Sequence, residues 1–372
     1  MNGTFDEETL AAAEEALADG VPFGSHDHIS ARVHEAYAGL LSAMSASVPA
    51  ASALLDALGA ADAGLERLVL GDPLLRRTVE DGACLHLLGR DAIDEGELND
   101  ILTVAAEYTR RGHAPLLAKA TGCVRVGEAA HHGHVWTRTA EDGSPAARRF
   151  TAQCLSRLPG VRVERATDDT VATLAEAVEI VDRTLPRLGR SALSHTYMMV
   201  VATTDGRFAF DSLTVPGIPG AIFLSPSVLT SPERAADAVF HESMHLKLMD
   251  IDYAEHLFAL GFRPQLAPTV SPPWHDDEQQ WPLDRLLTAM HVYTGLAVFF
   301  GRIANARGGS PTDPAEYPVD PVAKHRRAVR RGRFLLDASR EHPDAFSAAG
   351  RSFIDWVGGI QAPLGAPSLE LR

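Results

Sequence analysis

Residues 195–211, HTYMMVVATTDGRFAFD, are the stretch in which the pattern of this 372-residue chain changes from helix to strand. Apolar residues run from Tyr197 to Ala202, and the pair Asp205-Gly206 is typical of a tight hairpin turn. A third short strand is expected at 220–224, GAIFL. We therefore expect a small antiparallel hairpin or sheet inside a protein that is otherwise helical.

The sequence on both sides of this stretch is predicted to be mostly helical. From about Glu7 to Lys119 it is rich in Ala, Leu and Glu and is broken by turn signals such as Gly-Asp-Pro at 71–73. Further helices are expected at 168–188 and 283–306, and two more follow from residue 321. The expected fold class is α+β, mostly α. We expect a helical region at 1–150 and a metal-binding catalytic region at 151–372, which could form one continuous domain.

Composition excludes several classes of partner. The formal net charge of −15 argues against a nucleic-acid surface, because phosphate binding needs clustered Lys and Arg. The acidic N-terminus, MNGTFDEETL, is unlike a secretory signal. The sequence has no apolar run of about 18 residues, so no membrane span is predicted. Three scattered cysteines, Cys84, Cys123 and Cys154, form no CxxC pair. These features predict a cytoplasmic protein without a nucleic-acid or membrane partner.

The helix that follows the expected sheet carries the motif HESMH at 241–245. We expect it to begin at Pro232 with Ser231 as its N-cap. Because positions i and i+4 lie on one face of a helix, His241 and His245 can direct two imidazole nitrogens at one divalent metal. In zinc peptidases the Glu of this motif is the general base, which would be Glu242. The alternative is a pair of helix histidines without a metal.

A catalytic metal site also needs a third protein ligand. The metzincin pattern fails, because Leu248 stands where a glycine is required and Ile251 where a histidine is required. Glu255 is too near the motif for the thermolysin-like arrangement, and His256 lies about 16 Å along a continuous helix. We favour His291, although a histidine on an apolar helix is more often a core residue. A separate group, HHGH at 131–134, is a competing candidate because three histidines in four residues can bind a metal, but it is expected to be an exposed loop.

Four segments carry a resemblance to a known family: VPGIPGAIFLS at 215–225, HESMHLKL at 241–248, PPW at 272–274 and LLTAMHVYTGLAVF at 286–299. With these segments the chain resembles the HExxH-domain proteins of ribosomal peptide natural-product clusters. Members of that family are described as iron(II)- and 2-oxoglutarate-dependent peptide β-hydroxylases. The sequence departs from the family at Trp274-His275-Asp276, where Trp-Arg is usual.

The resemblance implies that His241, His245 and His291 bind Fe(II). Three protein ligands leave three octahedral positions, enough for two oxygens of 2-oxoglutarate and for O2. Glu242 would then orient a ligand, or itself bind the metal, in place of acting as a base.

Other candidate site residues lie around the third histidine. Arg285 and Arg302 flank His291 on its helix, and either could bind the far carboxylate of 2-oxoglutarate through a bidentate guanidinium. Trp274 and Tyr293 could line the substrate pocket, although core packing is the more usual explanation for each.

The expected function is hydroxylation of a C–H bond, most simply at the β-carbon of a residue in a peptide natural-product precursor. The alternatives are a zinc-dependent peptidase or amidohydrolase and a non-catalytic binding partner in a biosynthetic cluster. A carrier-bound or free amino acid remains open as the substrate. The basic run Lys324–Arg333 is expected to be a solvated helix face or a docking site for an acidic leader peptide.

Overall fold

The computed structural model describes residues 5–113, 124–126, 134–135, 148–152, 158–206, 209–274, 279–308 and 320–365. Within these residues the protein is α+β and mostly α, as predicted from the sequence. The described strands form one six-stranded sheet and one two-stranded ladder.

The chain divides into two compact units. The first comprises Met1–Ile29, Val181–Ala192 and Lys247–Arg372, and the second comprises Ser30–Ile180 and Leu193–Leu246. Because the units alternate along the chain, neither coincides with the regions 1–150 and 151–372. That division stays a prediction.

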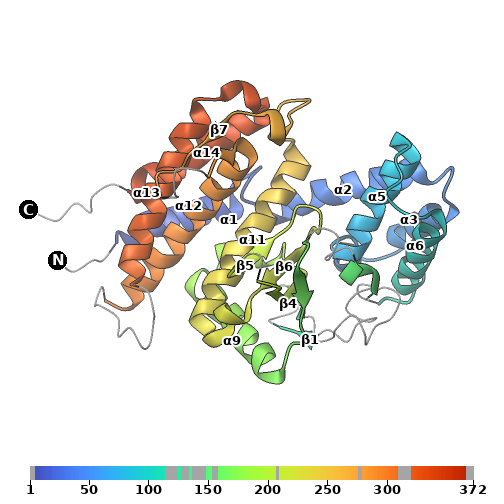
Figure 1. Cartoon of the computed structure of the whole chain (residues 1–372), viewed down its shortest axis with the longest axis horizontal. Helices are drawn as coiled ribbons and strands as arrows, with labels where there is room; N and C mark the ends of the chain where they lie inside the picture. The colour runs from blue at the N-terminus through green and yellow to red at the C-terminus, as the bar shows by residue number, and fades with distance from the viewer. Residues whose placement is uncertain are drawn as a thin grey trace, which may run out of the picture. The chain divides into compact units, whose positions relative to one another are not determined.

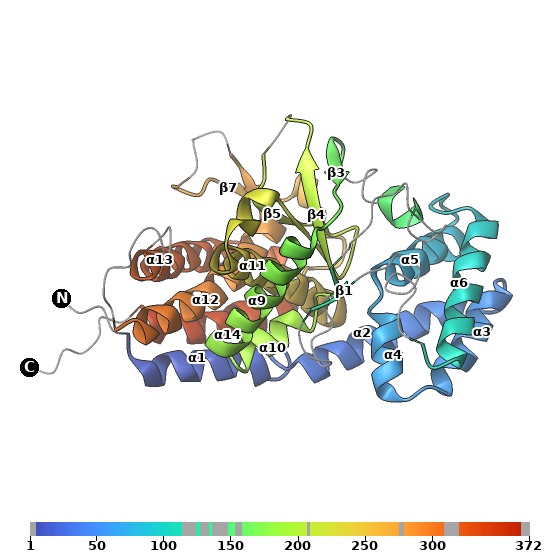
Figure 2. The same ribbon diagram turned by 90° about the horizontal axis from the view of Figure 1, so that it is seen from below.

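The first unit is a helical bundle. Its main helices are α1 (Glu7–Asp19), α12 (Leu283–Ala306), α13 (Pro321–Arg340) and α14 (Ala348–Leu364). Helix α12 packs against the other three, and the four lie side by side in Figures 1 and 2. Two short strands, β7 (Thr269–Val270) and β8 (Trp281–Pro282), form the antiparallel ladder before α12. Two single 3-10 turns, η3 (Pro264–Leu266) and η4 (Pro343–Ala345), lie in the loops.

Helix α12 begins and ends where the sequence predicted, and it has buried residues on every side. It is long and apolar enough to span a membrane, yet 83% of its apolar window is buried inside the protein. No other helix in the described part of the chain passes the same length and composition test. A helix that is apolar all round and covered by protein is a core helix.

The second unit contains a cluster of four helices and the main sheet. The cluster is α3 (Pro49–Gly59), α4 (Ala63–Leu70), α5 (Pro73–Leu88) and α6 (Glu95–Arg110), with α6 packing against each of the others. The predicted break at 71–73 is real: Asp72 caps α5 by accepting hydrogen bonds from the amides of Leu74 and Leu75, and Pro73 is the first helical residue. Helices α2 (His26–Met44) and α9 (Asp168–Thr184) have most of their residues in this unit, and the short α10 (Leu188–Leu193) has most of its residues in the first.

The main sheet is built around strand β4 (Met198–Thr204). Its order is β1-β2-β4-β6-β5, with β3 (Val161–Val163) paired antiparallel to the C-terminal end of β4. Strands β2 (His134–Val135) and β6 (Ala221–Leu224) run parallel to β4. Strands β1 (Val124–Arg125) and β5 (Ser212–Thr214) are antiparallel edge strands. Apolar side chains of β4 and β6, with Phe150 and Leu74, form a buried core cluster.

The pairing within this sheet differs from the predicted hairpin. The antiparallel hairpin is formed by β5 and β6, and β6 lies between β4 and β5. The reason lies in burial: the first five residues of β4 and all four of β6 are buried, as in central parallel strands, which read as continuous apolar runs. The Asp205-Gly206 turn follows β4, and the Asp205 amide donates to the Gly160 carbonyl beside β3.

Helix α11 (Pro232–Glu255) carries the HESMH motif and begins as predicted. The amide of Arg234 donates to the Ser231 hydroxyl, and Pro232 occupies the first position. The helix ends at Glu255 because His256 adopts a left-handed backbone conformation, with φ of 54°. Residues 232–246 of the helix belong to the second unit, and Figure 1 shows them beside β5 and β6.

Candidate metal site

His241 and His245 point at the same place on the surface of α11. Their Nε2 atoms are 3.1 Å apart, and both side chains are partly buried. One turn of helix separates them, so their convergence follows directly from the i, i+4 spacing.

The separation of the two nitrogens fits two ligands of one metal ion. With metal–nitrogen bonds of about 2.1 Å, the 3.1 Å distance subtends about 95° at the ion. That value is close to the right angle between adjacent octahedral positions. The competing explanation is an N–H···N hydrogen bond between a neutral pair, which the same distance allows.

Glu242 lies between the two histidines in sequence but faces the sheet. Its carboxylate accepts hydrogen bonds from the Ser212 hydroxyl at 2.7 Å and from the Thr214 hydroxyl at 2.9 Å, and the residue is 3% exposed. One carboxylate oxygen lies 4.0 Å from Nε2 of His241. Both oxygens are therefore held by strand β5 while the group stays next to the histidine pair.

Sequence reasoning missed these two hydroxyl donors. A signal was available, since Ser212 and Thr214 are two residues apart in a strand and so project from the same face. Their partner could not be inferred without the register of β5 against the helix.

The rest of α11 around the motif is fixed by buried polar contacts. In the second unit, the Ser243 hydroxyl donates to the Val239 carbonyl at 2.7 Å and lies 2.8 Å from the Thr196 hydroxyl. In the first unit, the fully buried ammonium of Lys247 donates to the carbonyls of Leu17 and Gly24 and to the hydroxyl of Ser191. Burial lowers the pKa of Lys247 to about 7.

His291 belongs to the first unit, on α12. It is fully buried, and its ring centroid is 5.7 Å from that of Phe353 and 6.4 Å from that of Trp356, both on α14. These contacts match the core environment that an apolar helix provides. Its role as the third metal ligand stays a prediction.

The two candidate arginines have different surroundings. Arg302 forms ion pairs with Glu7 and with Glu14, whose carboxylate is 2.9 Å away and buried. Arg285 is exposed and its guanidinium lies 4.1 Å from the ring centroid of Trp281. Desolvation lowers the pKa of both guanidinium groups, and both remain charged because that pKa starts far above neutrality. Arg302 is thus committed to α1, whereas Arg285 is exposed.

Trp274 and Tyr293 lie next to each other. Their rings meet edge to face with centroids 6.3 Å apart. Arg331 of α13 joins them: its guanidinium lies 5.0 Å from the Trp274 centroid and donates to the Tyr293 hydroxyl at 2.9 Å. These contacts pack the three side chains against one another, and lining a substrate pocket stays a prediction.

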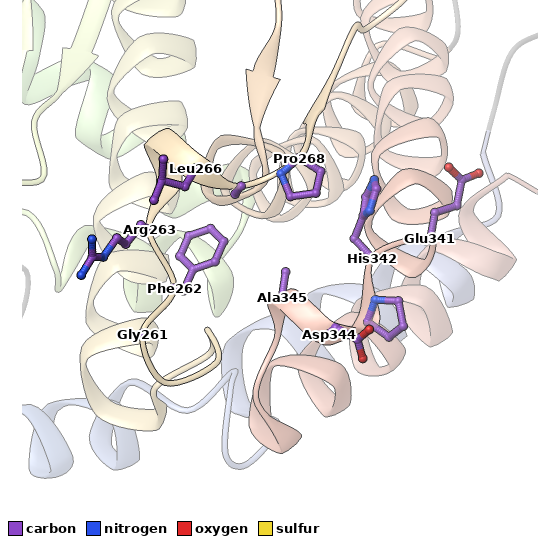
Figure 3. A pocket seen from close by; sticks show the side chains of 11 residues that line it. Gly261, Phe262, Arg263, Leu266, Pro268, Glu341, His342, Asp344 and Ala345 are labelled. Carbon is purple, nitrogen blue, oxygen red and sulfur yellow. The ribbon is translucent and has the colours of Figure 1, made fainter.

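A pocket of about 650 Å³ opens elsewhere in the first unit, between the loop after α11 and the loop between α13 and α14. In Figure 3 the ring of Phe262, the ring of Pro268 and the imidazole of His342 surround it, while Glu341 points away. No residue predicted from the sequence to form the site lines this pocket.

The full metal site is not assembled within the described part of the chain. No group of three or more His, Cys, Asp or Glu side chains there is close enough to hold a metal. His131 and His132 lie outside the described residues, as does His275, and His134 is described only as part of strand β2. The structure therefore brings two predicted ligands together and leaves the third as a prediction.

Comparison with known proteins adds no relative. The chain matches no family model, and a search of curated proteins finds no match. The candidate chemistry therefore rests on the side chains themselves.

Proposed function

We propose that the protein is an iron(II)- and 2-oxoglutarate-dependent hydroxylase that acts on a C–H bond in a peptide. The observation that carries the proposal is the combination of convergent imidazoles at 241 and 245 with a Glu242 carboxylate held by two hydroxyls. The sequence resemblance to HExxH-domain peptide β-hydroxylases supports the same function. The third ligand in this proposal is His291.

The surroundings of Glu242 favour an oxygenase over a zinc hydrolase. A hydrolase needs this carboxylate to take a proton from a metal-bound water, so the group must reach the water freely. Here the side chain is 4% exposed, and each carboxylate oxygen is held in place by one hydroxyl of β5. A buried, doubly held carboxylate beside a ligand is suited to fixing the helix face that presents the histidines.

Each remaining residue has a role that its surroundings allow. Bound iron, with 2-oxoglutarate and O2, supplies the oxidising power for the hydroxylation. His241 and His245 hold the ion on one face of α11. Arg285 is the proposed partner of the distant carboxylate of 2-oxoglutarate, because Arg302 already pairs with Glu14 and Glu7. Trp274 and Tyr293 are the proposed contacts of the peptide.

Metal binding and product mass test the proposal. Protein reconstituted without oxygen is expected to bind one Fe(II) per chain, and His241→Ala is expected to lose that binding while keeping its helical content. With 2-oxoglutarate, O2 and a library of short peptides, a product heavier by one oxygen atom is expected. Cleavage into two fragments with Zn(II) bound would instead establish the hydrolase, and binding of no metal would refute both.

A further inference from the structure

Helix α13 carries a concentration of positive charge that is unusual for this acidic chain. Its 20 residues, PVAKHRRAVRRGRFLLDASR, include seven Lys or Arg and one Asp. The helix therefore carries a net charge of +6. Since the whole chain carries −15, the rest of it carries −21.

Three of these arginines form what we term the basic face: Arg326, Arg327 and Arg330. All three are exposed. Within the described part of the chain, no carboxylate forms an ion pair with any of them. Two neighbours on α13 differ, because Arg331 binds Tyr293 and Arg333 donates to the Ala362 carbonyl at 3.2 Å.

The basic face costs the helix stability. Arg326 and Arg330 are four residues apart and Arg327 and Arg330 are three apart, so like charges are neighbours on the helix surface. Each such pair destabilises a helix. A solvated surface usually mixes charges of both signs, and a single-sign face without a described counter-charge is instead suited to attracting an anionic partner.

The residue type indicates which anions fit. Guanidinium groups bind carboxylates or phosphates through two parallel hydrogen bonds, and the basic face is made of Arg only. Arg326 and Arg330 are separated by about 6 Å along the helix axis. Alternate side chains of an extended peptide lie about 6.6 Å apart on one face. The spacing therefore matches acidic residues at alternate positions of an extended segment.

The charge of the whole chain favours a peptide over a nucleic acid. A long polyanion would extend beyond this short face and meet the −21 carried by the remainder of the chain. A short acidic segment flanked by neutral residues meets only the three arginines.

We propose that Arg326, Arg327 and Arg330 dock an extended acidic segment of the peptide substrate, with carboxylates at alternate positions. That the segment belongs to the enzyme's own substrate rests on the proposed function. The docking of an acidic segment does not depend on that function.

The test is a binding measurement on the full-length protein without added iron or 2-oxoglutarate, so its outcome is separate from that of the hydroxylase assay. The probe is a fluorescein-labelled peptide of alternating Glu and Gly, and its counterpart has Gln for Glu. The Glu peptide is expected to bind at least about tenfold more tightly, and added salt is expected to weaken it, as for exposed charge pairs.

Two sets of variants locate the binding. The combined variant Arg326→Glu, Arg327→Glu and Arg330→Glu is expected to lose at least about tenfold in affinity, and the same three changes to Gln guard against effects of charge reversal on folding. The matched control reverses three exposed arginines elsewhere, Arg90, Arg162 and Arg165. Equal losses in the control would overturn the proposal, as would equal binding of the Gln peptide. Tighter binding of a single-stranded oligonucleotide through the same arginines would replace it with a nucleic-acid site.

Discussion

Removing the two hydroxyls that hold Glu242 should destabilise the protein in a measurable way. Thr214→Val is nearly isosteric, and Ser212→Ala removes a single oxygen, so neither change leaves a large cavity. Each hydroxyl donates to the carboxylate of Glu242, whose side chain is 4% exposed, at 2.9 Å and 2.7 Å respectively. The effect should therefore come from the lost hydrogen bond.

The magnitude follows from the charge on the acceptor. A hydrogen bond to an ionised group contributes about 1.5–3 kcal/mol, and a buried acceptor left without a donor pays its desolvation in full. Each single variant should lower the free energy of unfolding by about 2 kcal/mol. The double variant should lose about 4 kcal/mol.

Urea denaturation followed by circular dichroism measures these differences. The control is Ser227→Ala, which removes a hydroxyl that donates at 2.9 Å to the carboxylate of Asp211 in an exposed setting. The control should change stability by less than about 0.5 kcal/mol. If Thr214→Val and Ser212→Ala are as mild as the control, Glu242 is not held by β5 and the argument against a hydrolytic base fails.

Three further changes test other contacts. Lys247→Met removes a buried ammonium whose pKa is lowered to about 7. The unfolded chain binds that proton more tightly than the folded chain does. The stability of the wild type should therefore rise relative to that of the variant by roughly 4 kcal/mol between pH 7 and 10. Parallel pH profiles of urea unfolding would contradict this. Arg302→Gln leaves the buried carboxylate of Glu14 without its cation and should cost about 3 kcal/mol; an unchanged melting temperature would show that the ion pair is dispensable. Gly71→Ala places a Cβ inside contact distance of the Tyr197 ring and should cost about 3 kcal/mol or more, so a variant of wild-type stability would disprove that close approach.

The helices could be predicted from the sequence because their signals are local. Ser231 and Pro232 mark the start of α11, and the apolar surface of α12 sets its length. The strand pairing could not be predicted in the same way. The run MMVVA of β4 is apolar because both faces are covered, and nothing in the run itself shows that β6 lies beside it.

The candidate site shows the same difference between local and long-range signals. The convergence of His241 and His245 follows from helical spacing alone, and the structure confirms it. The contacts of Glu242 depend on strand β5, and the commitment of Arg302 depends on α1, some 290 residues away in the sequence. Partners that are distant in sequence have no local signal, so these roles needed the folded chain.

Release of succinate from 2-oxoglutarate tests the central claim most directly. Protein reconstituted with Fe(II) and supplied with 2-oxoglutarate and O2 is expected to release succinate, faster when a peptide substrate is added. His241→Ala and His245→Ala should abolish that release while retaining the circular dichroism of the wild type. If the iron-loaded wild type forms no succinate with any candidate peptide, or if the two variants form as much as the wild type, the protein is not a 2-oxoglutarate-dependent hydroxylase that uses this histidine pair.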